Sequence, residues 1–130
     1  MAVTPLELVH VAAIAADDKK AQDIVIIDLE NETDMCDYFL ICTASSKAQA
    51  DAVLEAIEEK VKKNCQEAPL SVEGKAGSGW TLMDYGAVVI HVFRPEAREY
   101  FRIECLWGDA PRVNFGLEGQ AELDSSDKNK

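Results

Sequence analysis

Few side chains in this chain have the types and spacing that catalysis requires. The 130 residues include two histidines, His10 and His91, and we recognise no Ser–His–acid set around either of them. Such a set matters because a hydroxyl becomes a good nucleophile only beside an activating base. His91 alternates with Ile90 and Val92 in an apolar run, so it should face away from them as an ordinary strand residue. We therefore predict a protein that is not an enzyme and has no catalytic residues.

Phosphate and metal chemistry also lack the residues that they need. Residues 43–46 (TASS) stand where a strand should meet a helix, and free backbone N–H groups there can hold a phosphate. The segment has no P-loop glycines and no Walker lysine, so helix capping explains its serines better. Asp34, Asp37 and Asp84 could bind magnesium only if they converged, which nothing in the sequence requires. The four cysteines form no CxxC pair, so we expect no metal and no cofactor.

Aromatic residues are concentrated between residues 80 and 111. Both tryptophans, two of the three tyrosines and two of the four phenylalanines fall in this stretch, although only 7% of the chain is aromatic. Large aromatic side chains either fill a core or anchor an interface. For Trp80 the two alternatives are about equal, whereas Trp107 is expected in the core.

The strand expected at residues 80–84 would present part of this aromatic surface. Side chains alternate along a strand, so Trp80, Leu82 and Asp84 should point to one face. Unless helices cover both faces, one of them carries exposed apolar groups and is a candidate partner-binding surface. The residues that should point to the opposite face are Thr81, Met83 and Tyr85.

Helices and strands in a regular order should position these residues. Thr4-Pro5-Leu6-Glu7 combines a capping box with proline at the first helical position, which predicts a helix start. Apolar β-branched runs predict buried strands, and a turn at Tyr85-Gly86 should join two of them into a hairpin. In chain order we expect a helix at 5–17, strands at 23–29 and 38–42, a helix at 46–64, strands at 80–84 and 87–93, and a helix at 95–106, with room for a short strand at 70–72.

This order predicts a single α/β domain in which helices flank a mixed β-sheet. A chain of 130 residues suits one domain, which should occupy residues 1–111. Residues 112–130 show no hydrophobic periodicity and end in the polar sequence SSDKNK, so they are expected to form a mobile C-terminal tail.

Net charge restricts the kind of partner. The chain carries 24 Asp and Glu against 13 Lys and Arg, a formal charge of −11. Such a surface repels phosphate backbones and attracts basic proteins, although the acidity could also serve solubility alone. No apolar run approaches the roughly 20 residues that span a bilayer. The N-terminus shows no targeting signal, so we expect a cytoplasmic protein without membrane contact.

Three motifs follow one another in this chain: DYFLICTASS at residues 37–46, EGKAGSGWTLMDYGAVVIHVF at 73–93 and REYFRIECLWGDAP at 98–111. Together they resemble the ribosomal silencing factor family, which is also called Iojap-like. The resemblance covers about residues 5–111, and its specificity comes from the order and spacing of the three motifs, because each motif alone would be weak.

The resemblance implies a translation repressor. Members of the family bind ribosomal protein L-fourteen on the large ribosomal subunit and block joining of the small subunit when nutrients are limiting. The implied fold is nucleotidyltransferase-like without the catalytic acids. The acidic charge adds the expectation of little direct nucleic-acid contact. A homodimer of the free protein is compatible with this function. Two alternatives stay open: a nucleotidyltransferase-type enzyme that uses Asp84 with Asp34 or Asp37, and a structural module that self-associates through the hairpin.

By position, the partner-binding motif of the family falls on residues of the expected hairpin and of the helix after it. Ala87 stands where many relatives carry an acid, so a contact made by that carboxylate is not expected in this chain. The partner-binding residues that the resemblance implies are Glu73, Trp80, Leu82, Met83, Asp84, Tyr85, Arg98 and Tyr100.

Overall fold

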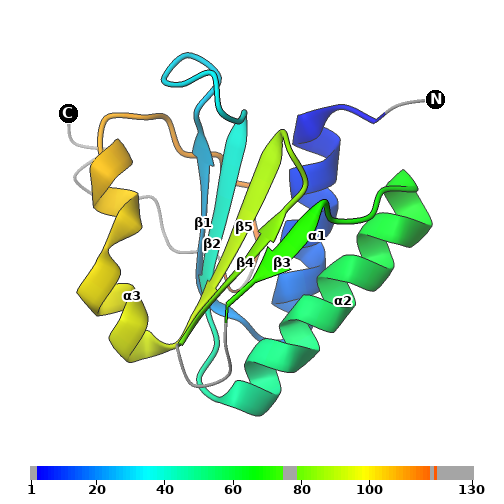
Figure 1. Ribbon diagram of the computed structural model, residues 1–130, viewed down its shortest axis with the longest axis vertical. Helices are drawn as coiled ribbons and strands as arrows, with labels where there is room; N and C mark the ends of the chain where they lie inside the picture. The colour runs from blue at the N-terminus through cyan, green and yellow to red at the C-terminus, as the bar shows by residue number, and fades with distance from the viewer. Residues whose placement is uncertain (1–2, 75–78, 118, 120–130) are drawn as a thin grey trace.

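The chain folds around one mixed β-sheet that has helices on both faces (Figure 1). The computed structural model describes residues 3–74, 79–117 and 119. Its elements are α1 (Pro5–Asp18), β1 (Gln22–Asp28), β2 (Tyr38–Thr43), α2 (Lys47–Cys65), β3 (Ser71–Glu73), β4 (Trp80–Asp84), β5 (Val88–Phe93), α3 (Pro95–Phe101) and the 3₁₀ helix η1 (Ile103–Trp107). The helices α1 and α2 cover one face of the sheet, and α3 lies on the other. The predicted α/β domain with a mixed sheet is confirmed.

The strands of the sheet follow the order β1-β2-β5-β4-β3. β2 and β5 run parallel at the centre, whereas the neighbouring pairs β1–β2, β5–β4 and β4–β3 are antiparallel. The parallel pair needs a long crossover, which α2 supplies by packing on one face. β3 consequently becomes an edge strand with β4 as its partner.

Both long helices begin at the caps that the sequence predicts. The Thr4 hydroxyl accepts a hydrogen bond from the Glu7 N–H at 3.1 Å, and the Glu7 carboxylate accepts from the Thr4 N–H at 2.8 Å. Ser46 caps α2 by accepting from the Gln49 N–H at 3.1 Å. α2 ends where Gln66 adopts a left-handed φ of 58°. The N-cap explanation of the TASS serines is therefore confirmed for Ser46.

The alternation of side chains along the strands divides the core into two layers. In β2, Leu40 points toward α1 and α2, whereas Ile41 points toward α3. Both residues are fully buried, and burial of such a side chain contributes roughly 1.5–3 kcal/mol to stability. The layer under α3 and η1 is the smaller one; its buried members are Ile27, Leu29, Cys36, Ile41, Phe93 and Ala110.

The predicted hairpin forms from β4 and β5. The Tyr85 N–H donates to the Val88 carbonyl at 2.8 Å, and Gly86 adopts a φ of +87° that favours glycine. The turn at Tyr85-Gly86 is thus confirmed, and it fixes a register in which Leu82 lies opposite His91.

The predicted helix at residues 95–106 is wrong in its second half. α3 ends at Phe101 because Arg102 adopts a left-handed φ of 48° and donates its N–H to the Arg98 carbonyl at 2.9 Å. The tighter helix η1 follows, and its Ile103 and Trp107 pack against the layer of the core beneath α3. The predicted core position of Trp107 is therefore confirmed in part, since this side chain is half-buried.

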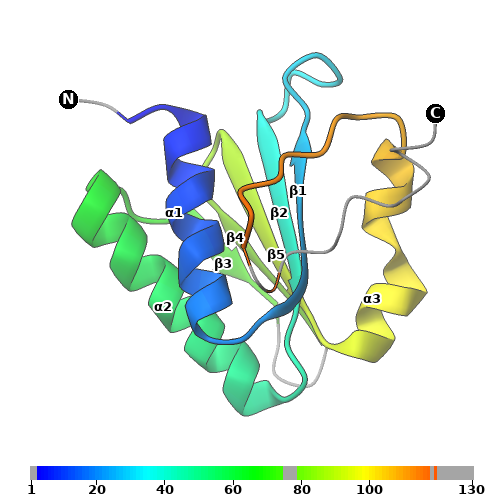
Figure 2. The same ribbon diagram turned by 180° about the vertical axis from the view of Figure 1, so that it is seen from behind.

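The described part of the C-terminal segment runs along the outer edge of β1 (Figure 2). Arg112 forms an antiparallel bridge with Ile27, and the Gly119 carbonyl accepts from the Ile24 N–H at 3.0 Å. The predicted domain ended at residue 111, whereas the packing observed here continues to Gly119; residues 118 and 120–130 of the predicted tail lie outside the described residues. The side chains of this segment that pack against the core are Val113, Phe115 and Leu117.

Candidate protein-binding surface

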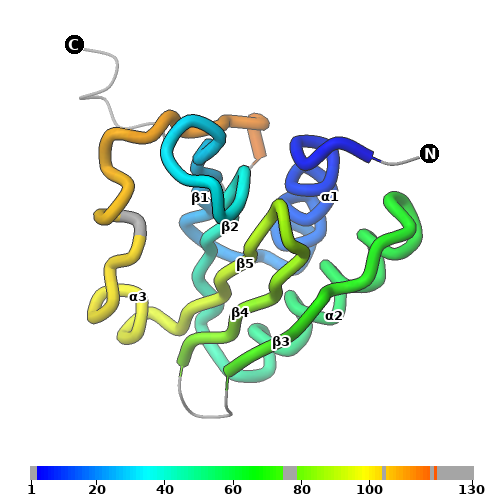
Figure 3. The backbone as a smooth tube through the Cα atoms, turned by 45° about the horizontal axis from the view of Figure 1, so that its top comes forward, coloured from blue at the N-terminus to red at the C-terminus, as the bar shows by residue number. Residues whose placement is uncertain are grey.

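Four of the predicted site residues, Glu73, Trp80, Leu82 and Asp84, lie on one face of the sheet and are called the β4 face below. Glu73 of β3 is paired with Leu82 of β4, and Trp80 and Asp84 occupy the alternate positions on either side of Leu82. The predicted alternation of faces is confirmed, because Trp80 packs with the layer under α3 and Met83 with the opposite layer. Figure 3 shows β3 at the outer edge of the sheet, away from α3.

The β4 face is open enough to receive a partner. The three side chains from β4 are half-buried, and Glu73 is exposed. The face therefore combines apolar surface from Trp80 and Leu82 with the carboxyl groups of Glu73 and Asp84. Apolar anchors surrounded by charged groups are typical of protein interfaces.

Trp80 is held in place by a hydrogen bond and by ring stacking. Its indole Nε1–H donates to His91 Nδ1 at 3.1 Å. Its ring stacks on Phe93 at a centroid distance of 5.2 Å and an interplanar angle of 23°, and it tilts against Phe101 at 4.7 Å. The side chain is thus a rigid part of the aromatic packing that also keeps exposed surface. Trp80 is thus partly a core residue, and its role at an interface stays a prediction.

His91 is the structural residue behind Trp80. Only 3% of it is exposed, and burial lowers its pKa to about 4, so the ring is neutral near pH 7. Its Nδ1 accepts the indole hydrogen, whereas its Nε2 is buried without a partner among the described residues. The sequence correctly predicted that His91 points to the opposite face from Ile90 and Val92. It did not predict the hydrogen bond with Trp80, because that contact depends on the register between β4 and β5, in which Leu82 lies opposite His91.

Asp84 shapes the hairpin turn. Its Oδ1 accepts a hydrogen bond from the Gly86 N–H at 2.7 Å, so the carboxylate stabilises the turn from the end of β4. One of the two carboxylate oxygens of Asp84 therefore has a structural role in the turn. Any role of Asp84 toward a partner is added to this structural one.

Met83 and Tyr85 were predicted as partner-binding residues, but they point to the other side of the sheet. They are 1% and 8% exposed and belong to the layer of the core under α1 and α2. Burial also raises the pKa of the Tyr85 hydroxyl, which keeps the group uncharged. These two side chains offer almost no surface, so their contribution is to hold β4 against the core.

Arg98 and Tyr100 of α3 have different environments. The Arg98 guanidinium donates to the Asp23 carbonyl at 2.6 Å and to the Thr43 hydroxyl at 2.8 Å, which ties α3 to the end of the sheet. Tyr100 is 81% exposed and contacts the Phe101 ring edge-on at 5.0 Å. Leu106 of η1 is 76% exposed and was not predicted as a site residue. An isolated leucine at a helix end carries no sequence signal for exposure.

No cluster in the described part of the chain supports metal chemistry. Among residues 3–74, 79–117 and 119, no group of three or more His, Cys, Asp and Glu side chains could hold a metal ion. The same ranges contain no helix long and apolar enough to cross a membrane. In the TASS segment, the Thr43 hydroxyl accepts from Arg98 and Ser46 caps α2, so two of its hydroxyls already serve the fold.

Comparison with known proteins identifies the family. The family model described as "Ribosomal silencing factor during starvation" matches residues 2–130. The chain belongs to this family. The ribosomal silencing factor RsfS of Bacillus subtilis is 39% identical over 112 residues, which are 85% of this chain and 94% of the relative. The protein of the same name from Halalkalibacterium halodurans is 40% identical over 116 residues, 87% of this chain and 94% of the relative.

A solved structure shares the fold of this member of the ribosomal silencing factor family. The crystal structure of a protein from Chromobacterium violaceum superposes with a TM-score of 0.77 at 28% identity, and the match covers 94% of this chain and 100% of that one. The family resemblance expected from the three sequence motifs is therefore confirmed. The likeness to nucleotidyltransferases stays a prediction.

Proposed function

We propose that this protein silences ribosomes by binding ribosomal protein L-fourteen on the large subunit and blocking joining of the small subunit, which represses translation under nutrient limitation. Membership of the ribosomal silencing factor family supports the silencing of ribosomes. The observation that carries the specific contact is the β4 face, where Trp80 and Leu82 present apolar surface between Glu73 and Asp84.

Electrostatics favour a basic protein over RNA as the direct contact on the ribosome. With a net charge of −11, the chain is repelled by phosphate backbones, and the carboxyl groups of the β4 face suit Lys and Arg side chains. This charge favours a contact with protein and little contact with nucleic acid. The large subunit and the cytoplasm belong to the proposal through the family, not through the charge. No catalytic step is part of the proposal.

The proposal is tested by cosedimentation of the purified protein with large ribosomal subunits and by capture of isolated L-fourteen. Leu82→Ala removes a half-buried apolar side chain from the β4 face, and truncation of an interface anchor costs more than about 1 kcal/mol. We expect the affinity for L-fourteen to fall about tenfold. Inhibition of subunit joining, followed by light scattering, should weaken in parallel.

A matched pair of charge reversals separates the β4 face from overall charge. Glu73→Lys changes an exposed carboxylate on that face, and Glu59→Lys makes the same change on the exposed side of α2. We expect weaker binding for Glu73→Lys alone. Equal binding by both variants, together with unchanged binding by Leu82→Ala, would remove the β4 face from the proposal while leaving the silencing activity open to another surface.

Self-association of the free protein is a second part of the proposal, and it rests on β3. This strand is an edge of the sheet, and two apolar residues at the edge, Leu70 and Val72, are 75% and 52% exposed. Unpaired edge strands with apolar side chains invite pairing with another chain. Val72→Lys should shift the sedimentation coefficient toward that of a monomer, whereas Val72→Thr should not. A monomeric wild-type protein at all concentrations would contradict homodimer formation.

A further inference from the structure

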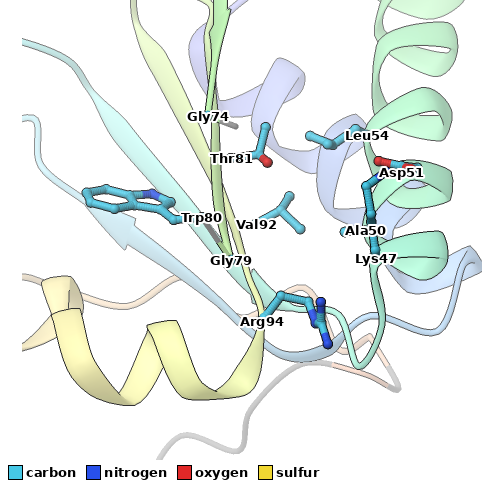
Figure 4. Close-up of a pocket in the computed structure, with 10 residues that line it drawn as sticks. All are labelled: Lys47, Ala50, Asp51, Leu54, Gly74, Gly79, Trp80, Thr81, Val92 and Arg94. Atoms are coloured by element: carbon cyan, nitrogen blue, oxygen red, sulfur yellow. Dashed lines mark hydrogen bonds and ion pairs between the residues drawn. The ribbon is translucent and has the colours of Figure 1, made fainter. Parts of the chain in front are cut away.

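A cavity on the α2 side of β4 is separate from the β4 face. It has a volume of about 210 Å³ and lies between the first half of α2 and the strands β4 and β5 (Figure 4). The ring of Trp80 points away from it, to the other side of the sheet. Sites for drug-sized ligands usually measure roughly 300–1,000 Å³, so this cavity suits a smaller molecule. Its lining includes Lys47, Asp51, Leu54, Thr81, Val92 and Arg94.

Arg94 is the residue that makes this cavity chemically distinctive. It follows β5, and Figure 4 shows its side chain reaching toward the beginning of α2. Its Nε is buried and has no hydrogen-bond partner among the described residues. Nor does any described carboxylate form an ion pair with its guanidinium. A half-buried arginine without an anion is unexpected in a chain with a charge of −11, because desolvation of an uncompensated cation destabilises the fold.

The other polar groups of the cavity leave the charge of Arg94 uncompensated. Among the described residues of the lining, Asp51 is the carboxylate, and it forms an ion pair with Lys47 at 3.0 Å. That pair is exposed, with 61% and 58% of the two side chains accessible, and its charges cancel. The cavity therefore keeps the positive charge of Arg94. The Thr81 hydroxyl adds a neutral hydrogen-bonding group, and Leu54 and Val92 add apolar wall.

We propose that this cavity is a binding site for a small phosphate-type oxyanion, either inorganic phosphate or the phosphate group of a small ester, held by the Arg94 guanidinium. Arginine presents planar N–H donors that match the oxygens of phosphate, and such charge-assisted hydrogen bonds are among the stronger ones in proteins. Lys47 at the rim would approach the same anion by exchanging its contact with Asp51. The site is independent of the proposed contact with L-fourteen.

The test is a titration of the full-length protein with inorganic phosphate at constant ionic strength, followed by ¹H–¹⁵N NMR. We expect saturable shifts at the Arg94 side chain and at the amides of Lys47 and Thr81. Parallel titrations with glycerol 3-phosphate and with uncharged glycerol distinguish the sources. Tighter binding of glycerol 3-phosphate assigns the site to a phosphate ester, equal binding assigns it to the oxyanion itself, and both support the site. Shifts with glycerol alone would contradict the role of the anion.

Substitution of Arg94 tests whether its guanidinium binds the phosphate. Arg94→Met keeps the length of the apolar stem and removes the charge, and it should weaken phosphate binding at least about tenfold. Arg102→Met is the matched control, because Arg102 is exposed and does not line this cavity. Should Arg94→Met fail to fold, Lys47→Met at the exposed rim is expected to weaken binding severalfold. Absence of saturable shifts in the wild type, or unchanged affinity in the folded variants, would overturn the proposal.

Discussion

At the scale of single residues, Trp80 and His91 form the pair on which the β4 face depends. The hydrogen bond from the indole Nε1–H of the half-buried Trp80 satisfies an acceptor, His91 Nδ1, in a side chain that is only 3% exposed. Because His91 is buried and neutral, one of its ring nitrogens carries no proton, and the contact with the indole N–H assigns that nitrogen as Nδ1. Packing and this hydrogen bond therefore fix the orientation of the Trp80 ring, and part of the ring stays exposed. Such rigid aromatic side chains lose little entropy when they bind a partner.

Replacement of the indole tests this pairing. Trp80→Phe keeps an aromatic ring near Phe93 but removes the indole N–H that donates to His91 Nδ1. His91 Nδ1 then lacks this hydrogen bond. We expect the free energy of unfolding to fall by about 1–3 kcal/mol, the usual cost of an unsatisfied buried polar group. Urea denaturation measures this change. Trp107→Phe, which removes no hydrogen bond of this kind, is the control and should cost less.

Acidification tests the burial of His91. The folded state holds the pKa of His91 at about 4, below the usual value of 6.5, so between these pH values the unfolded chain takes up a proton that the folded chain does not. The free energy of unfolding should therefore fall as the pH drops from 6.5 toward 4, by up to about 1.4 kcal/mol per pH unit. Above pH 6.5 this contribution to stability is fully present.

Denaturation curves across this pH range measure the effect. His91→Phe should lower the stability at pH 7, because Trp80 loses its acceptor, yet it should flatten the dependence on pH. His10→Phe is the control and should leave the slope that comes from His91 in place. An unchanged slope in His91→Phe would contradict the assignment.

At the scale of elements, the segment after η1 completes the sheet. Its bridge to Ile27 and its hydrogen bond from Ile24 cover an edge of β1 that would otherwise be unpaired. Phe115 also stacks on His10 of α1 at a centroid distance of 3.9 Å, so the segment joins the sheet edge to the first helix. Its contribution is one of packing as well as of backbone pairing.

Two truncations test this contribution. Removal of residues 112–130 deletes three apolar side chains that are packed against the core, and we expect a loss of about 2–4 kcal/mol in the free energy of unfolding. Removal of residues 120–130 keeps every contact described here and should cost much less. Thermal and urea denaturation of both proteins give the comparison. Equal stability of the two would show that the segment adds nothing to the fold.

The elements that the sequence predicts well are those with local signals. The capping box at Thr4, an N-cap within residues 43–46 and the turn at Tyr85-Gly86 all depend on neighbouring residues, and all three occur in the structure, with Ser46 as the cap of α2. The break after Phe101 was missed because the left-handed backbone of Arg102 leaves no mark on hydrophobic periodicity. The edge pairing of Arg112 was missed because it joins residues far apart in the chain.

The candidate site shows the same division. Alternation along β4 correctly separated Trp80 from Met83. It could not show that the face of Met83 and Tyr85 is covered by helices, since coverage depends on how α1 and α2 cross the sheet. The role of His91 and the lack of a described partner for Arg94 Nε also depend on tertiary packing, which the spacing of residues does not reveal.

At the scale of the whole molecule, the charge of −11 should govern the approach to the ribosome. Charge attraction to a basic protein is screened by salt, and the Debye length shortens from about 10 Å at 0.1 M to about 3 Å at 1 M ionic strength. We expect the association rate with isolated L-fourteen to fall at least about tenfold over this range. Stopped-flow fluorescence or surface plasmon resonance gives the rate. A rate independent of salt would contradict electrostatic steering.

The parallel pairing at the centre of the sheet has a consequence for how the chain is made. Tyr38 of β2 pairs with Val88 of β5, 50 positions later. A nascent chain that has emerged only through α2 therefore still lacks β5, the parallel partner of β2, together with β3 and β4. Closure between such distant strands slows folding, and an unpaired edge exposes the chain to aggregation in the meantime. The order of synthesis thus leaves one side of β2 unpaired until β5 has left the ribosome.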